Sequence, residues 1–317
     1  MSDTILPTDS GLDPEVTKQA TPDEASSHPF RSFGRRLGDA AVAIAVLLPS
    51  LVIFATFFFY PLYRFVHLSL NRPDNFGRRE IYVGPSQLWS TLTGEQFSAG
   101  LRITVTFVLM TVPLGIVLGT LLAVAAHRRL RGIRIFQTVF SSTVASSAAV
   151  ASVVFFVLLN PEVGYFRNVD FLSLSNPDTA LRGIAVTAIW QNLGLTFVIV
   201  LAGLQAVPDE IMEAAALDGF GPLRRFFRVT VPLISPTLLF LVVVLVIFAF
   251  QAYAQMDILT RGGPVDSTQT LVFRIVENRS GPATSVGAGL SLGLFGVTLL
   301  VTLGQFLILE RRVHYGR

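Results

Sequence analysis

The chain of 317 residues contains no cysteine and only one lysine, and 14% of its residues are charged. The missing cysteine excludes disulfide bonds and thiolate metal sites. A nucleotide-binding P-loop needs a lysine that reaches the phosphates, and Lys18 lies in a polar stretch with no glycine-rich loop before it. The chain is therefore not a P-loop ATPase, and any ATP-driven activity requires a separate subunit.

The charged residues are also too few for an ordinary soluble domain, in which they make up about a quarter of the sequence. Hydrophobic residues make up 51% of the chain and its mean hydropathy is +0.60, so we expect lipid to be its solvent. The net charge of +3 comes from arginines near the ends of apolar runs, which argues against nucleic acid as a partner. The four histidines show no metal-ligand spacing, so we expect no metal site.

Six apolar runs predict an all-α integral membrane protein with six transmembrane helices. Each run has more than 20 residues, and a helix that rises about 1.5 Å per residue then crosses a hydrocarbon core of about 30 Å. Open strands are excluded, because lipid leaves their backbone groups unpaired. The approximate limits are 40–63, 103–126, 135–159, 183–207, 236–258 and 287–309.

The positions of the basic residues predict how these helices are oriented. Fourteen of the 24 lysines and arginines lie in the two tails and in segments 127–134 and 208–235, against eight in the three intervening loops. Basic residues concentrate on the cytoplasmic side, so both termini should face the cytoplasm. We expect residues 1–38 to be a disordered cytoplasmic tail, residues 39–310 the six-helix domain and residues 311–317 a short cytoplasmic tail.

The interiors of the six runs hold no Asp, Glu, Lys, Arg or His, which argues against proton coupling and indicates a pathway lined by neutral polar and aromatic groups. Such a pathway suits a polyol or a sugar. Two clusters of such groups occur within the runs. They are Trp190, Gln191 and Asn192 in the fourth run, and Gln251, Tyr253 and Gln255 late in the fifth.

In a continuous helix Gln251 and Gln255 share a face, whereas Tyr253 points elsewhere. Hydrogen bonding between helices is the alternative role for all these side chains. Arg64, just past Pro61, could attract a phosphate by charge-assisted hydrogen bonds, or could extend toward water or lipid phosphate instead.

Segment 207–235 is too polar to cross lipid, yet it is strongly patterned. Pro208 suits the first turn of a helix that Gly219 would end, and Pro222 can open a second short helix. Acidic residues follow Pro208, at the positive end of the first helix, and arginines follow Pro222. The segment therefore predicts two short helices joined by glycine, held between the fourth and fifth membrane helices.

The same segment resembles the cytoplasmic signature of the permease subunits of binding-protein-dependent ABC importers. That signature reads Glu-Ala-Ala, three residues, Gly, nine residues, Ile, one residue, Leu-Pro. Valine replaces both Ile and Leu here, and Phe220 stands where alanine is frequent. The matching positions are Glu213, Ala214, Ala215, Asp218, Gly219, Phe226 and Pro232.

Further stretches resemble narrower groups within that family. Tyr60-Pro61-Leu62 and the Thr-x-Gly-Gly-Pro sequence at 260–264 are similar to the maltose-type carbohydrate permeases, in which the latter loop lies on the binding-protein side. The ending at 310–315 is similar to the first membrane subunit of glycerol-3-phosphate importers.

The resemblance implies a type I ABC importer permease in a bacterial inner membrane, with segment 207–235 as the coupling helix that docks on the ATPase. It implies four kinds of partner: a second homologous permease, two copies of an ATP-binding subunit, an extracytoplasmic solute-binding protein and the lipid bilayer. ATP and Mg would bind the partner ATPase, with no cofactor and no bond chemistry in this chain. The implied solute is glycerol-3-phosphate or a related glycerophosphodiester; an oligosaccharide of the maltose or trehalose type is the alternative.

Two other functions compete with this interpretation. A secondary transporter working alone needs an ion-coupling site, and sodium bound by backbone carbonyls would provide one without any acidic side chain. A membrane-embedded enzyme needs catalytic groups, and the sequence shows no nucleophile motif, no His-Glu metal spacing and no paired acids within the apolar runs.

Overall fold

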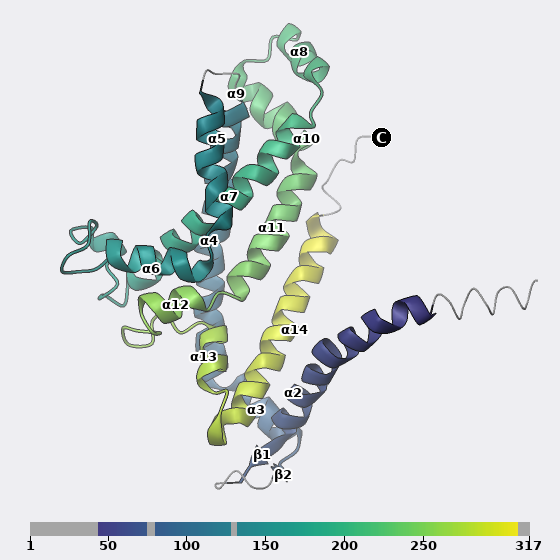
Figure 1. The fold of residues 1–317 in the computed structure, drawn as a ribbon, viewed down its shortest axis with the longest axis vertical. Coiled ribbons are helices and arrows are strands. Elements are labelled where there is room, and N and C mark those ends of the chain that lie inside the picture. The colour runs from purple at the N-terminus through teal and green to yellow at the C-terminus, as the bar shows by residue number, and fades with distance from the viewer. Residues whose placement is uncertain (1–43, 75–79, 128–131, 310–317) are drawn as a thin grey trace, which may run out of the picture. The chain divides into compact units, whose positions relative to one another are not determined.

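The computed structural model describes residues 44–74, 80–127 and 132–309, and these residues are mostly helical (Figure 1). The predicted tails at 1–38 and 311–317 lie outside the described residues. The chain divides into two compact units, residues 1–59 and residues 60–317. Apart from one two-stranded sheet, the described residues confirm the all-α prediction.

Long helices alternate with short helical pieces along the chain. The first unit contains the π-helix η1 (Ala55–Phe59). The second unit begins with α2 (Tyr60–Leu70), β1 (Asn71–Pro73), β2 (Glu80–Tyr82), α3 (Pro85–Thr93) and α4 (Glu95–His127). It continues with α5 (Ile133–Ser142), η2 (Thr143–Ala145), α6 (Ala148–Leu158), η3 (Asp170–Leu172) and α7 (Ala180–Gln205). It ends with α8 (Asp209–Leu217), α9 (Pro222–Arg225), η4 (Phe226–Thr230), α10 (Val231–Leu233), α11 (Ser235–Phe250), α12 (Ala254–Leu259), α13 (Leu271–Glu277), η5 (Gly281–Ala283) and α14 (Thr284–Leu309).

Four helices in the described residues are long and apolar enough to cross a membrane, and each overlaps a predicted run. Two further runs are bent pairs of helices, so the number of spans rises to six if each pair crosses once. The count of six stays a prediction. The four unbroken helices are Ile44–Leu70, Glu95–His127, Ala180–Gln205 and Gly281–Leu307.

The predicted run 135–159 is interrupted at two serines. Its two halves, Ile133–Ala145 and Ala148–Leu158, meet at an angle of 106°. Ser146 adopts an extended conformation, and the Ser147 side chain accepts a hydrogen bond of 3.2 Å from Val150 N. An N-cap of this kind satisfies a backbone donor that the start of a helix leaves unpaired, so the serine restarts the helix as α6.

The predicted run 236–258 is also wrong at its end, because the helix stops at Phe250. Residues 251–253 are not helical, and α12 begins a new short helix at Ala254. The other end is bent too: Pro222–Leu233 and Ser235–Phe250 meet at 69°, with Pro236 in the first turn of α11. A proline suits that turn because its missing N–H has no partner there in any case.

The second unit is built around the contact between α4 and α7. Gly119 of α4 lies so close to Thr196 of α7 that an added Cβ would come 2.7 Å from the threonine Cβ. Gly194 of α7 lies closer still to Thr143 of η2. Small residues let helix backbones approach closely, and van der Waals contact drives helix association in lipid. These glycines therefore permit the packing on which the unit depends.

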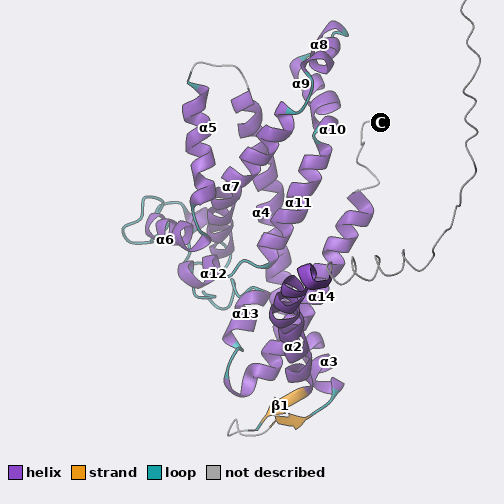
Figure 2. Cartoon of the chain, turned by 45° about the vertical axis from the view of Figure 1, so that its right-hand side comes forward, coloured by secondary structure: helices purple, strands orange, loops and turns teal. Residues whose placement is uncertain are grey.

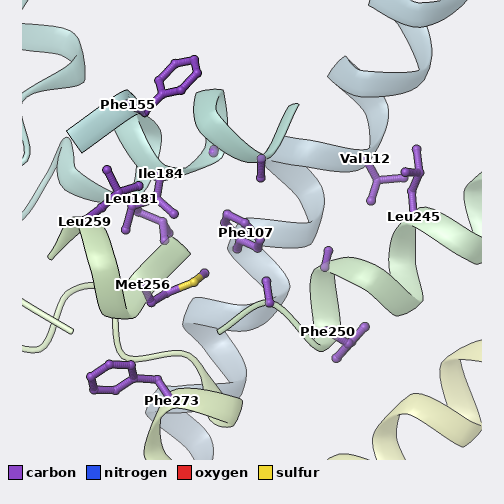
Figure 3. Close-up of a cluster of buried hydrophobic side chains, with 14 of the residues drawn as sticks. Phe107, Val112, Phe155, Leu181, Ile184, Leu245, Phe250, Met256, Leu259 and Phe273 are labelled. Atoms are coloured by element: carbon purple, nitrogen blue, oxygen red, sulfur yellow. The ribbon is translucent and has the colours of Figure 1, made fainter. Parts of the chain in front are cut away.

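A cluster of buried apolar side chains fills the space beside this contact (Figure 3). Phe107 of α4 is fully buried at its centre, with Ile184 of α7 on one side and Met256 of α12 on another. Phe250, the last residue of α11, closes the cluster next to the break at 251–253. The broken end of α11 is thus held in place by the packing of Phe250 in this cluster.

The two ends of the second unit are different in kind (Figure 2). Helices α8, α9 and α10 lie at one end, and α3 lies with the antiparallel pair β1–β2 at the other. Helix α14 packs against α2, α3 and α13 near this second end. Helices α8–α10 therefore lie at one end of the unit, and the break after α11 lies away from that end.

Candidate functional site

Segment 207–235 forms the short helices that its sequence predicts, with one difference at the start. Pro208 is the N-cap of α8 rather than its first helical residue, since its ψ of 136° is extended. Pro222 opens α9 as predicted, and the chain then continues through η4 and α10 to Leu233. The second helical piece is therefore longer than expected and contains a π-helical turn.

Gly219 ends α8 through a left-handed turn. Its φ is +77°, a value that glycine adopts without steric cost. The Gly219 N–H donates to Ala216 O and the Phe220 N–H donates to Ala215 O, each at 3.1 Å. These are the two hydrogen bonds of a Schellman motif, which satisfies the last carbonyls of a helix. The glycine is thus required by the backbone geometry of this turn.

Phe220, the position that departs from the family pattern, has a clear place in the turn. Its ring lies 4.4 Å below the Arg224 guanidinium, which is a cation–π distance. Residue 220 directly follows the left-handed glycine, so this contact joins the turn to α9. Phenylalanine at this position therefore leaves the hydrogen bonds of the turn intact.

The outer surface of α8 combines acidic and apolar side chains. Glu213, Ala214 and Asp218 are exposed, whereas Ala215 is buried. Leu217 is 90% exposed and Leu223 of α9 is 75% exposed. Two large apolar side chains of this segment are therefore exposed beside the exposed carboxylates of α8.

Two of the predicted coupling residues lie away from this surface. Phe226 turns inward and lines a cavity of about 190 Å³ together with Met212 and Thr230. The Thr230 hydroxyl lies 3.8 Å from the Met212 sulfur. Pro232, six residues after Phe226, is exposed in α10. Phe226 thus contributes to the joint between the short helices and the membrane helices rather than to the exposed surface.

A second cavity, of about 370 Å³, lies where α11 ends, between α4, α7 and the break at 251–253. We call it the polar cavity. Five of the six predicted pathway residues of the fourth and fifth runs line it. They are Gln191, Asn192, Gln251, Tyr253 and Gln255.

The geometry that joins these five residues differs from the predicted one. The expectation that Gln251 and Gln255 share a helix face, with Tyr253 elsewhere, assumed a continuous helix and is wrong. Because the chain leaves the helix after Phe250 and restarts at Ala254, all three residues line the cavity. Tyr253 also stacks on Phe273 of α13, with ring centroids 5.9 Å apart.

Hydrogen bonds fix the amide groups of the cavity wall. Gln255 is 5% exposed, and its Nε2 donates to Gln191 Oε1 at 3.4 Å. Asn192 Nδ2 donates to Ala188 O, one turn earlier in α7, at 3.0 Å. The Asn192 carbonyl oxygen keeps its capacity to accept, because only its amide nitrogen takes part in this bond. The wall is therefore both ordered and able to bind a hydroxyl.

Trp190 and Arg64 do not line the polar cavity. The Trp190 ring packs on Phe155 of α6, with centroids 5.6 Å apart. Arg64 Nη2 lies 3.9 Å from Glu80 Oε1, and His67 Nδ1 lies 3.3 Å from Glu80 Oε2. This exposed ion pair joins α2 to β2, so the structure gives Arg64 a partner within the chain.

The sequence did not single out the small and apolar residues that complete the wall. Thr111, Val112 and Gly115 of α4 line the cavity, as does Ala148 at the start of α6. One signal was present in α4, because Pro113 interrupts the backbone hydrogen bonding of the helix next to these residues. Ala148 carried no such signal.

Loop 260–270, between α12 and α13, is fixed by a buried hydroxyl. Thr268 is fully buried, and its Oγ1 lies 2.7 Å from Thr260 Oγ1 and donates to Gly263 O at 2.9 Å. The loop holds Val265 at a φ of +49° and leaves it 87% exposed. A β-branched residue rarely adopts this conformation, so the surrounding hydrogen bonds must hold the loop in place.

Comparison with known proteins shows the family to which the chain belongs. The sequence profile described as "Binding-protein-dependent transport system inner membrane component" matches residues 112–315. The chain is similar to the sn-glycerol-3-phosphate transport system permease protein UgpA of Yersinia enterocolitica, with 34% identity over 85% of this chain and 94% of the relative. The protein of the same name from Rhizobium meliloti is 34% identical over 86% and 95%.

Among solved structures, the chain resembles a bacterial alginate ABC transporter in complex with an alginate pentasaccharide-bound periplasmic protein. The TM-score is 0.74 at 18% identity, over 89% of this chain and 99% of that chain. At this identity the likeness shows a shared fold.

Proposed function

Since this chain belongs to the family of binding-protein-dependent transport system inner membrane components, we propose that it forms half of the translocation pathway of an ATP-driven importer for glycerol-3-phosphate or related glycerophosphodiesters. The observation that carries the proposal is the match to two glycerol-3-phosphate permeases over 85% and 86% of the chain. The fold of an ABC importer subunit supports it.

In this proposal segment 207–235 binds the partner ATPase and transmits its movement to the membrane helices. Glu213 and Asp218 on the exposed side of α8 offer carboxylates, and Leu217 offers an apolar contact to a partner ATPase. The Schellman turn at Gly219 fixes α8 relative to α9, so a push on α8 would reach α11 through η4 and α10. The proposed role of the segment is therefore mechanical, and the chain performs no bond chemistry itself.

The polar cavity is the proposed site where the solute passes. Its volume of about 370 Å³ falls in the range of small-molecule pockets, about 300–1,000 Å³. Movement of the helices around it would open it to one side of the membrane and then the other, as in alternating access. A second homologous permease would supply the other half of the pathway, and an extracytoplasmic binding protein would deliver the solute.

The same proposal places the chain in a bacterial inner membrane with both termini in the cytoplasm. The family name supports the inner membrane. The excess of arginine and lysine in the tails and in segments 127–134 and 208–235 supports the orientation. Two copies of an ATP-binding subunit, which hold ATP and Mg, would then dock on segment 207–235 from the cytoplasm.

The experiment is ATP hydrolysis by the assembled transporter in liposomes, with its binding protein loaded with each member of a solute panel. We expect glycerol-3-phosphate or a glycerophosphodiester to stimulate hydrolysis and Glu213→Ala to abolish this stimulation. Stimulation by maltose or trehalose alone would leave the importer assignment and overturn the solute. The exposed Glu162→Ala, on the loop after α6, is the matched control and should behave as the wild type.

A further inference from the structure

Every side chain that lines the polar cavity is uncharged, although the proposed solute is an anion. The polar lining groups are four amides, one phenol and one hydroxyl. They are Gln191, Asn192, Gln251, Gln255, Tyr253 and Thr111. Charged hydrogen-bond partners bind phosphate about twice as strongly as neutral ones, and arginine is preferred for it. The composition of this wall fits a different part of the solute.

The pair formed by Gln191 and Gln255 has a defined donor and acceptor pattern. A primary amide offers one carbonyl oxygen and one NH₂ group. The pair shares a single hydrogen bond of 3.4 Å, and no other hydrogen bond of these two side chains occurs among the described residues. Whichever amide donates, one carbonyl oxygen and one NH₂ group remain for a ligand. A hydroxyl group, which donates and accepts at once, satisfies both.

The cavity has no cation among its lining residues, which disfavours a phosphate at this wall. Of the charged residues just outside it, Asp257 and Glu277 are acidic and Arg279 is basic, and all three interact with Tyr253 of the wall. A phosphomonoester carries about −1.5 to −2 charges at neutral pH. Taking that charge out of water beside neutral amides lacks the compensation that a cation in the wall itself would give.

These observations extend the proposed function and rest on it. The geometry points to a wall that recognises the hydroxyl groups of the glycerol part of the solute through Gln191 and Gln255, with the phosphate turned away from this chain. The chain then sets the specificity for the polyol part. The charge is neutralised on the side of the pathway that this chain does not supply.

The test compares two solutes that differ by one hydroxyl, glycerol-3-phosphate and 3-hydroxypropyl phosphate, in uptake by the complete transporter in liposomes. The ratio of their uptake efficiencies is measured for the wild type and for Gln191→Leu/Gln255→Leu. The binding protein contributes the same factor to both ratios, so a change between them belongs to this chain. We expect the preference for glycerol-3-phosphate to fall about tenfold in the double variant, as for the loss of one or two hydrogen bonds.

Gln205→Leu is the matched control, since Gln205 lies on the same helix, is exposed and does not line the polar cavity. It should keep the wild-type ratio. If the double variant does not assemble, the same two solutes are compared with Gln191→Leu alone, because Gln191 is only half-buried. An unchanged ratio in a variant that still transports would overturn the inference and leave the proposed function standing.

A second variant tests the position of the phosphate. Gln251→Arg adds a cation to the exposed rim of the cavity. With the phosphate turned away, the KM for glycerol-3-phosphate should change less than about fivefold, the scale of an exposed charge pair. A larger fall in KM would place the phosphate against this wall and overturn the inference. Failure of the wild type to take up these two solutes and any glycerophosphodiester would instead overturn the proposed function.

Discussion

Replacement of Gly219 tests whether the turn after α8 transmits force. Gly219 has a φ of +77°, and no heavy atom lies within 4 Å of the position that an added Cβ would take. A different residue at position 219 would therefore be strained by its backbone conformation and not by a steric clash of its side chain. An L-residue in the left-handed region costs about 1–2 kcal/mol. Gly219→Ala should therefore raise the population of opened turn about 5–30-fold.

The substitutions at this position should rank by their backbone preference. Asparagine tolerates the left-handed region better than alanine, so Gly219→Asn should cost less than Gly219→Ala. Gly219→Pro should cost most, because proline fixes φ near −65° and removes the N–H that donates to Ala216 O. Gly221 also has open space around it but lies at a φ of −62°, which makes Gly221→Ala the matched control.

The assay is solute-stimulated ATP hydrolysis by the assembled transporter. We expect stimulation to decrease in the order wild type, Gly219→Asn, Gly219→Ala and Gly219→Pro, with Gly221→Ala equal to the wild type. Equal activity of the three Gly219 variants would refute the reasoning, because the turn conformation would then not matter. An equal loss in Gly221→Ala would also refute it, since the loss would then not depend on positive φ.

Three further predictions concern packing and surface charge. Gly119→Ala should destabilise the α4–α7 contact by about 1–3 kcal/mol, measured as a lower melting temperature in detergent. Adding Thr196→Ser should restore part of the lost stability, and a double variant that melts no higher than Gly119→Ala would contradict this. Thr268→Val should cost about 1–3 kcal/mol of unfolding free energy because it removes two partly buried hydrogen bonds, whereas Thr268→Ser should keep them. Glu80→Gln should change stability by less than about 1 kcal/mol and leave uptake intact, since the pair with Arg64 is exposed; loss of uptake in Arg64→Ala alone would assign the arginine to the solute.

Local signals in the sequence were enough for the long helices and for the turn at Gly219. The α4 and α7 helices follow from unbroken apolar runs, whose length fits a membrane core. The glycine at 219 indicated a helix end because few other residues adopt its conformation. Both signals act within a few residues, so the order of residues along the chain is enough to predict them.

The broken ends of α5 and α11 could not be predicted in the same way. Neither break contains glycine or proline, and the residues around Ser146 and Gln251 have no strong preference against a helix. Packing decides the end of α11, because Phe250 and Met256 both enter the core around Phe107. At the other break, the N-cap of Ser147 starts α6 in a new direction. The shape of the polar cavity depends on these breaks, so only part of its wall was predictable.

The most direct test of the whole account is solute uptake into liposomes that contain this chain with and without its partner permease, ATPase and binding protein. The account predicts ATP-dependent uptake of glycerol-3-phosphate or a glycerophosphodiester only when all components are present. Uptake by this chain alone, driven by an ion gradient and indifferent to ATP, would contradict it and show a secondary transporter.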